Sequence, residues 1–269
     1  QYAGRKQRHK PVQQILGELD NLYKFGYRMV FFADDNFTAN RQHAKELLGE
    51  LRDWNLRQKD GPVSFVTQVS IDSATDKELL RMCAEACLNY VFIGIETPNE
   101  DSLRQSGKDQ NLRNSLTEQI ECFMKSGIGV MAGMIVGFDS DGPDIFERQY
   151  QFAQSVPIPV FALGALVAPA RTPLYERLAA NGRLLPGDAG IATMKPWDTN
   201  IIPHGMKREE LLNGIKQLSA RLYESGAFTE RITRFIEKAA VPNSTKESGT
   251  LAQLRGRSVE IDAMRVIAN

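Results

Sequence analysis

The fold is decided by the stretch Val30-Phe31-Phe32-Ala33-Asp34-Asp35-Asn36-Phe37. Apolar and aromatic residues run without interruption in its first half and then stop at two carboxylates and an amide. A short apolar run of this kind, preceded by Gly26, is typical of a buried strand, which we predict over residues 27–33. The sequence therefore predicts a strand that delivers carboxylates to one end of a sheet.

Outward from this stretch, helices and strands alternate. A helix is predicted over residues 11–25, where Pro11 opens an apolar stripe at helical spacing. Further helices are predicted over residues 40–54, 76–86, 111–126 and 144–155, and further strands over residues 63–69, 90–95, 130–136 and 160–167. Because parallel strands need long crossover connections, this alternation predicts a parallel sheet, either a barrel or an open sheet.

The pattern changes to helices alone from about Pro173, with predicted helices over residues 174–180, 208–223 and 228–239. The segment after Val241 is rich in Ser, Thr, Gly and charge, which is typical of a flexible tail. We therefore expect a barrel or sheet domain over 1–172, a helical C-terminal extension over 173–240 and a tail over 241–269.

Composition narrows the classes of function. Lys and Arg number 33 and Asp and Glu number 33, so no net charge attracts the chain to nucleic acid or to an anionic membrane. No apolar run approaches the roughly 20 residues that span a bilayer. Three cysteines cannot form a disulfide framework, which favours a reducing, cytoplasmic location and small-molecule chemistry.

The polar residues after the strands are the candidate site. Asp34 and Asp35 would repel each other at a sheet edge unless a ligand binds them, and an ammonium group or ribose hydroxyls would suit them. The alternative is that Asn36 or Thr38 caps the next helix. Glu96 ends another strand and can accept hydrogen bonds from a sugar diol, or it is a turn residue of the following loop.

Two other features are less specific. Glycines stand at both predicted ends of a strand, at Gly133 and Gly137, as suits backbone approach by a flat ligand or close packing of strands. Cys83 and Cys87 are four residues apart in a predicted helix, and Tyr90 occupies the position that a third cluster cysteine would need. We interpret both thiols as buried on one helix face.

At this point the residues resemble a known family, the radical S-adenosylmethionine (SAM) proteins that carry cobalamin-binding domains. The similar stretches include Val30–Phe37, Val91-Phe92-Ile93-Gly94-Ile95-Glu96-Thr97-Pro98-Asn99, Gly133-Met134-Ile135-Val136-Gly137-Phe138-Asp139 and Pro169-Ala170-Arg171-Thr172-Pro173-Leu174-Tyr175. The resemblance covers roughly residues 4–235. It implies an α/β fold, a partial (β/α)6 TIM-like barrel whose first strand is missing, followed by the helical extension.

The resemblance also implies where a ligand binds. Asp34 and Asp35 would lie near the methionine amino group and the ribose, with Asn36 beside them, and Glu96 would face the ribose. The segment from Gly133 to Gly137 would lie beside the adenine. Ser70 would contact the methionine carboxylate or the substrate.

Two departures from the family pattern are visible. The Cys-x3-Cys-x2-Cys motif, whose thiolates hold a 4Fe-4S cluster, is absent, and we expect these ligands upstream of residue 1. Without them the chain cannot perform the chemistry. Ala170-Arg171 also stands in place of the glycine of the family's Pro-Gly-Thr-Pro stretch. The resemblance therefore implies nothing about the geometry of that loop in this chain.

The resemblance implies reductive cleavage of SAM to a 5′-deoxyadenosyl radical that abstracts hydrogen from a small molecule or hopanoid-like lipid. Cobalamin bound by an upstream domain would permit methyl transfer, and flavodoxin or ferredoxin would donate the electron. One alternative is a non-catalytic barrel that binds a nucleoside or a partner. Another is an unrelated enzyme in which Asp34, Asp35 and Glu96 bind Mg²⁺ or Mn²⁺.

Overall fold

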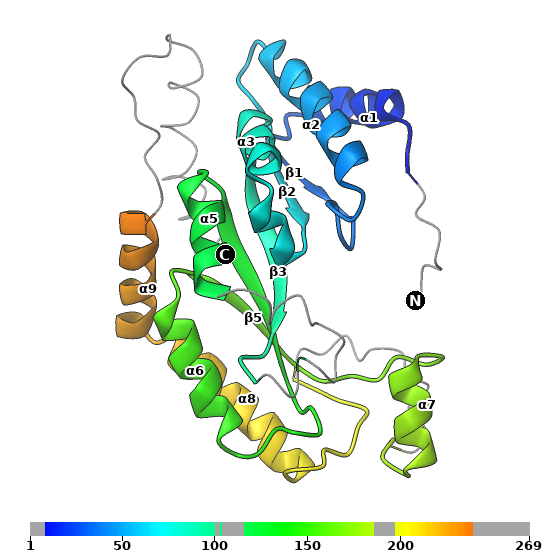
Figure 1. Cartoon of the computed structure of the whole chain (residues 1–269), viewed down its shortest axis with the longest axis vertical. Helices are drawn as coiled ribbons and strands as arrows, with labels where there is room; N and C mark the ends of the chain where they lie inside the picture. Colours follow the sequence, from blue (N-terminus) through cyan, green and yellow to red (C-terminus); the bar gives the residue numbers. More distant parts are fainter. Residues whose placement is uncertain (1–8, 100–102, 104–115, 186–196, 239–269) are drawn as a thin grey trace.

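A computed structural model describes residues 9–99, 103, 116–185 and 197–238 (Figure 1). The strands are β1 (Met29–Phe32), β2 (Ser64–Gln68), β3 (Leu88–Glu96), β4 (Gly129–Val136) and β5 (Val160–Ala165). The helices are α1 (Val12–Lys24), α2 (Arg41–Leu56), α3 (Lys77–Glu85), α5 (Leu116–Lys125), α6 (Ile145–Ser155), α7 (Pro173–Ala180), α8 (Arg208–Leu222) and α9 (Ser225–Lys238), with a 3-10 turn η1 (Ile71–Thr75).

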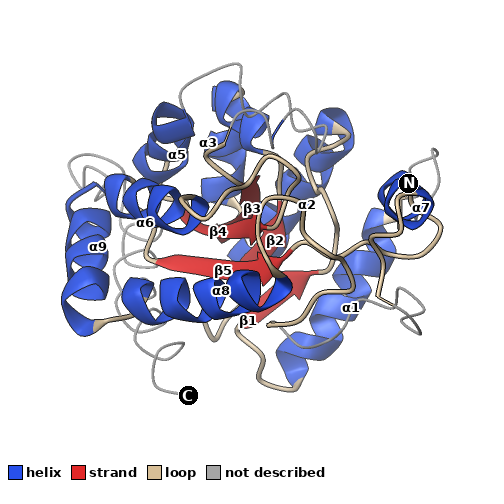
Figure 2. Cartoon of the chain, turned by 90° about the horizontal axis from the view of Figure 1, so that it is seen from below, coloured by secondary structure: helices blue, strands red, loops and turns tan. Residues whose placement is uncertain are grey.

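The five strands form one parallel sheet in the order β1-β2-β3-β4-β5. Every strand lies beside its neighbour in the chain, so the strand order has no reversal of the kind that defines a doubly wound open sheet. Consecutive order with right-handed crossovers is the arrangement of a barrel, in which the helices cover the outer side. Figure 2 shows the strands in the middle of the molecule with the helices arranged around them.

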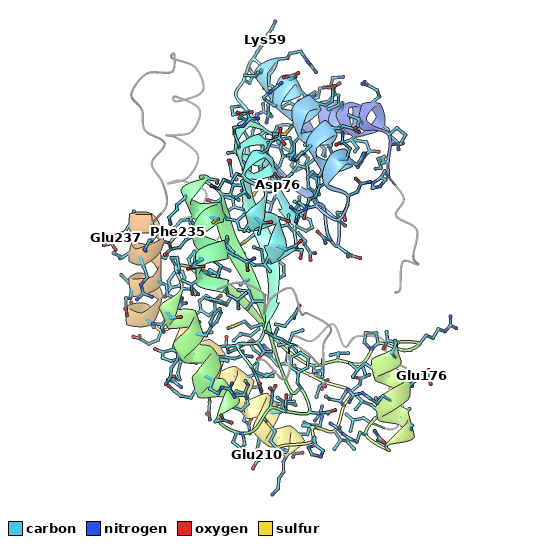
Figure 3. All side chains as sticks on the ribbon, viewed as in Figure 1. Lys59, Asp76, Glu176, Glu210, Phe235 and Glu237 are labelled. Atoms are coloured by element: carbon cyan, nitrogen blue, oxygen red, sulfur yellow. The ribbon has the colours of Figure 1, made fainter. Side chains whose placement is uncertain are left out.

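The helices α2, α3 and α7 begin at residues whose side chains accept a hydrogen bond from a free amide of the first turn. Asn40 accepts a hydrogen bond from His43 N at the start of α2, and Asp76 accepts one from Leu79 N at the start of α3. Asp76 lies between α2 and α3, where Lys45 also contacts it at 3.1 Å (Figure 3). The alternative that Asn36 or Thr38 caps α2 is therefore wrong, because Asn40 is the capping residue.

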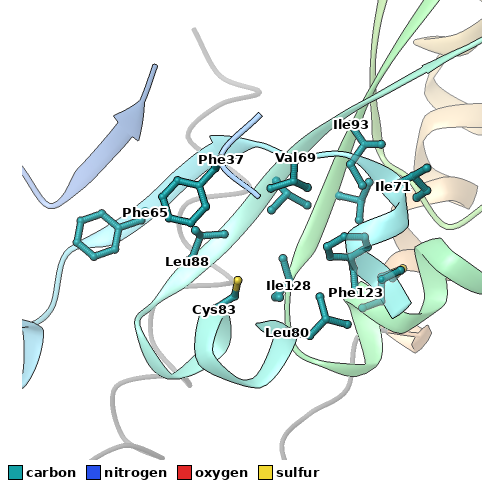
Figure 4. Packing of buried hydrophobic residues seen from close by; sticks show 14 of the residues in the cluster. Phe37, Phe65, Val69, Ile71, Leu80, Cys83, Leu88, Ile93, Phe123 and Ile128 are labelled. Atoms are coloured by element: carbon teal, nitrogen blue, oxygen red, sulfur yellow. The ribbon is translucent and has the colours of Figure 1, made fainter. Parts of the chain in front are cut away.

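The hydrophobic core lies between the sheet and these helices. Alternate residues of β3 point into it, with Val91, Ile93 and Ile95 fully buried. Figure 4 shows how residues from β2, β3, α3 and α5 meet there, with Phe65 and Phe123 among the largest buried side chains. In β3 and β4 the alternate residues point to the other face of the sheet and remain partly exposed, whereas β2 is buried on both faces.

The prediction that β1 is a buried strand is wrong. Met29 and Phe31, which lie on the same face of β1, expose 41% and 52% of their surface, and β1 is an edge strand that pairs only with β2. An apolar run indicates a strand without saying whether both of its faces are covered.

The C-terminal helices pack onto the same core. Leu218 and Leu222 of α8 and Phe235 of α9 belong to the main hydrophobic cluster, and α8 contacts both α6 and β5. Arg231 of α9 is fully buried, donates to the carbonyl oxygens of Leu222 and Ala227, and lies near three aromatic rings. The domain boundary after residue 172 stays a prediction, and the tail over 241–269 lies outside the described residues.

Within the described part of the chain, no helix is long and apolar enough to cross a membrane.

The predicted helix over 111–126 is described from Leu116 onward, and its first residues lie outside the described part.

Candidate functional site

A cavity of about 470 Å³ opens at the carboxyl ends of the strands. This end is where parallel barrels place their ligands, because the loops after each strand meet there. The cavity is lined by Asp35, Asn36, Gln68, Val69, Ser70, Phe92, Gly94, Glu96, Gly133, Met134, Ile135, Ala162, Leu163 and Gly164. All five strands or their following loops contribute to this lining, so the sheet itself builds the site.

One side of the cavity is polar, and we call Asp35, Asn36, Gln68, Ser70 and Glu96 the polar wall. Its members follow or end β1, β2 and β3, which lie next to one another in the sheet. The wall combines carboxylates, which accept hydrogen bonds, with amide and hydroxyl groups, which also donate them. A ligand that carries both an ammonium group and hydroxyls matches this set.

The two adjacent aspartates have different roles. Asp34 Oδ1 accepts a hydrogen bond from Asn36 N at 3.0 Å and so shapes the turn after β1. Asp34 does not line the cavity, whereas Asp35 does. The predicted pair therefore supplies one carboxylate to the site and one to the loop that presents it.

Glu96 stands in an unusual backbone conformation. Its φ is 69°, in the left-handed region that favours glycine, and the pairing of β3 with β4 shifts register between Gly94 and Glu96. The irregularity comes at the carboxyl end of β3, where Glu96 lines the cavity. Strained backbone of this kind persists where the surrounding structure or a function demands it.

The opposite side of the cavity is flat and apolar. Gly94 of β3 pairs with Gly133 of β4, and Gly133 pairs in turn with Ala162 of β5, so small residues form a row across three strands. A Cβ atom at Gly133 would lie 2.9 Å from Phe92 Cζ. The phenyl ring therefore occupies the space that a side chain at position 133 would need.

Gly133 and Gly137 lie in different surroundings, although the family resemblance places both beside the adenine. Gly133 lies within β4 rather than at its start, and it lines the cavity. Gly137 has a φ of 109° and donates its N–H to Asp141 Oδ2, and a Cβ there would contact Leu211 of α8. Gly137 is therefore needed for the turn after β4 and for helix packing, outside the cavity lining.

An ion-pair cluster ties the loop after β4 to the C-terminal region. Asp139 accepts hydrogen bonds from Arg177 of α7 at 2.5 Å and from Arg183 at 2.6 Å. Burial of Asp139 raises its carboxyl pKa, but the hydrogen bonds and charges of Arg183 and Arg177 outweigh this and leave the pKa lowered. The loop after β4 is thus joined to residues beyond the fifth strand.

The cysteines lie away from the cavity. Cys83 is buried in the core between Leu80 and Leu88, as Figure 4 shows, and burial raises the pKa of its thiol to about 12. Cys87 follows the end of α3 with a φ of 63°, so the prediction that both thiols share one helix face is wrong. Among the described residues no three His, Cys, Asp or Glu side chains are grouped to hold a metal ion.

We expect Cys83 to resist alkylation in the folded protein. Because its pKa is raised to about 12, the thiol stays protonated at pH 8.5, and only the thiolate is an efficient nucleophile. Mass spectrometry after iodoacetamide treatment would show Cys83 unmodified without denaturant and modified in it. Modification of Cys83 in the folded state at a rate like that of a free thiol would contradict its placement.

The fold and the cavity define the class as a parallel partial barrel with a ligand site at the carboxyl ends of its strands. The family model described as the radical SAM superfamily matches residues 1–153, and the model of a domain of unknown function, DUF4070, matches residues 172–268. The chain therefore belongs to the radical SAM superfamily.

The chain is similar to proteins named as methyltransferases. It is 37% identical to an uncharacterized methyltransferase of Synechocystis sp., over 89% of this chain and 44% of that protein. It is 32% identical to the hopanoid C-2 methylase of Rhodopseudomonas palustris, over 85% of this chain and 42% of that protein. The chain thus spans less than half the length of these two relatives.

The fold is also that of a solved structure. The radical S-adenosylmethionine methyltransferase TsrM from Kitasatospora setae, with cobalamin and a 4Fe-4S cluster bound, aligns with a TM-score of 0.55 and 20% identity. The alignment covers 66% of this chain and 34% of that chain. The predicted α/β partial barrel is confirmed.

The structure brings most of the predicted site residues together. Asp35, Asn36, Ser70, Glu96 and Gly133 line one cavity, whereas Asp34 and Gly137 do not. The prediction omitted the lining residues Gln68, Gly94, Ala162 and Gly164. Gln68 lies near the end of the strand predicted over residues 63–69 and carries a polar signal there, but the glycines of β3 and β5 give no signal until the strand register is known.

Proposed function

We propose that this chain is the SAM-binding core of a radical SAM enzyme. The observation that carries the proposal is the two-sided cavity, with a polar wall from β1, β2 and β3 and a flat apolar side from β3, β4 and β5. SAM has the same two-sided character, since it joins a charged methionine and a ribose diol to a flat adenine. Membership of the superfamily supports this choice over other nucleoside ligands.

Each part of SAM has a suitable partner in the cavity. Asp35 is the carboxylate suited to the methionine ammonium group, and Asn36 and Ser70 can donate hydrogen bonds to the methionine carboxylate. Glu96 can accept hydrogen bonds from both hydroxyls of the ribose diol. The ring of Phe92, which lies over Gly133, offers the adenine a flat apolar surface.

The described residues do not supply ligands for a 4Fe-4S cluster, because no cysteine is in the cavity lining. In this superfamily the cluster provides the electron that cleaves SAM to methionine and a 5′-deoxyadenosyl radical. We assign to this chain the binding and orientation of SAM, and we place the cluster thiolates in a segment outside it.

We further propose that the whole protein methylates an unactivated carbon of an apolar substrate, such as a hopanoid-like lipid. Two similarities support this, since one relative is named a hopanoid C-2 methylase and another an uncharacterized methyltransferase. Methyl transfer would use cobalamin bound by another domain, and flavodoxin or ferredoxin would donate the electron. A cytoplasmic location fits these electron donors.

The test uses the protein expressed with whatever sequence its gene encodes before Gln1 and reconstituted anaerobically with iron and sulfide, which we call the reconstituted protein. With dithionite as reductant, we expect it to convert SAM to 5′-deoxyadenosine and methionine, measured by chromatography. A reconstituted protein that binds SAM without cleaving it would favour the non-catalytic nucleoside-binding barrel. One that neither binds nor cleaves SAM would refute the proposal.

A further inference from the structure

A closed ring of hydrogen bonds lies directly behind the polar wall. Asn36 Oδ1 accepts from Ser70 N at 3.3 Å and from Thr38 Oγ1 at 3.0 Å, and Thr38 Oγ1 lies 2.6 Å from Ser73 Oγ. Ser73 N in turn donates to Ser70 O at 3.1 Å. The ring therefore joins the loop after β1 to the turn η1 that follows β2.

The direction of these hydrogen bonds is determined by chemistry. An amide oxygen only accepts, so the single proton of the Thr38 hydroxyl is donated to Asn36 Oδ1. Thr38 Oγ1 can then only accept from Ser73, whose hydroxyl must donate. The ring, together with the backbone N–H of Thr38 that also donates to Asn36 Oδ1 at 3.3 Å, fixes which end of the Asn36 amide faces inward, and the Nδ2 group is left to face other partners.

Thr38 and Ser73 have no direct access to a ligand. They expose 5% and 1% of their surface and do not line the cavity, whereas Asn36 and Ser70 do. Thr38 does not cap α2 either, because Asn40 fills that position. A buried pair of hydroxyls that serves no helix end, and whose partners line the cavity, requires another explanation.

We propose that Thr38 and Ser73 are positioning residues for the ligand. By holding Asn36 Oδ1, they direct the Asn36 Nδ2 donors and the Ser70 hydroxyl toward the cavity. The inference rests on the proposed function, since the ligand whose orientation they control is SAM. Fully satisfied buried networks make a site rigid, which is the property that orientation of a reactive ligand demands.

The test is Thr38→Val in the reconstituted protein, because valine keeps the shape and loses the hydroxyl. We expect the dissociation constant of SAM, measured by equilibrium dialysis, to rise about fivefold, which corresponds to about 1 kcal/mol, the contribution of one hydrogen bond. Thr38→Ser keeps the hydroxyl and should restore the original affinity. Ser73→Ala removes the next donor and should act in the same direction as Thr38→Val.

A double-mutant cycle distinguishes positioning of the ligand through Asn36 from a purely structural role of Thr38. If Thr38 acts through Asn36, then Thr38→Val should change SAM affinity no further in an Asn36→Ala background. Equal losses of affinity in both backgrounds would overturn the inference, as would unchanged affinity in folded Thr38→Val and Ser73→Ala. Failure of the unmodified protein to bind SAM would instead refute the proposed function on which the inference depends.

Discussion

Replacing Glu96 with glutamine should lower the affinity of the reconstituted protein for SAM by about ten- to hundredfold. Hydrogen bonds to a charged group contribute about 1.5–3 kcal/mol, and every 1.4 kcal/mol is a factor of ten in affinity. Glutamine retains the length and shape of the side chain but removes its charge and one of its acceptors. The loss should appear in the dissociation constant measured by equilibrium dialysis, with the melting temperature unchanged.

Glu96→Gly separates function from stability at the same position. A residue with a side chain at positive φ costs about 1–2 kcal/mol, and glycine avoids this cost but loses about 0.5–1 kcal/mol through its greater freedom when unfolded. Because Glu96 has a φ of 69°, the free energy of unfolding of the glycine variant should be unchanged or higher by up to about 1.5 kcal/mol. The Glu96→Gly variant should nevertheless bind SAM more weakly than the unmodified protein, because the carboxylate is lost.

Asp35→Ala is the companion variant, because Asp35 is the other carboxylate of the cavity, whereas Asp34→Ala tests a carboxylate that serves the turn. Asp35→Ala should weaken SAM binding with little change in stability. Asp34→Ala should act mainly through the loop and weaken binding less. Unchanged SAM affinity in both Asp35→Ala and Glu96→Gln would remove the assignment of the polar wall.

The sequence was enough to predict the sheet and the helices because each element has a clear period and a clear boundary. The helix over residues 40–54 is α2, and the strand over residues 130–136 is β4, each within two residues of its observed ends. The parallel arrangement followed from the spacing between strands. The choice of a barrel over an open sheet needed the strand order or the family resemblance, since periodicity is the same in both.

The candidate site was harder to predict because it depends on directions that local sequence does not encode. Asp34 and Asp35 are neighbours in the chain, yet only the hydrogen bond from Asn36 N shows which of them turns away from the cavity. Gly133 and Gly137 also look alike in the sequence. Only the structure shows that Gly137 has a positive φ, forms the turn after β4 and packs against α8. Side-chain direction at a loop is a tertiary property.

Gly133→Val should abolish tight SAM binding, because it places a side chain on the flat side of the cavity. A Cβ at this position already lies 2.9 Å from Phe92 Cζ, so the ring must move toward the space that the ligand would occupy. Overpacking typically costs about 1–3 kcal/mol. If this cost is paid only in the complex with SAM, the affinity falls by roughly five- to 150-fold.

Gly129→Ala is the matched control, because Gly129 is in the same strand and a Cβ there would lie 2.6 Å from the ring of Tyr90. Gly129 does not line the cavity, so its variant should lose stability of the same order while SAM affinity stays near that of the unmodified protein. Equal losses of affinity in both variants would mean that strain in β4, rather than occupation of the cavity, weakens binding. A larger loss in Gly133→Val, partly relieved by adding Phe92→Leu, would place the ligand against the row formed by Gly94, Gly133 and Ala162.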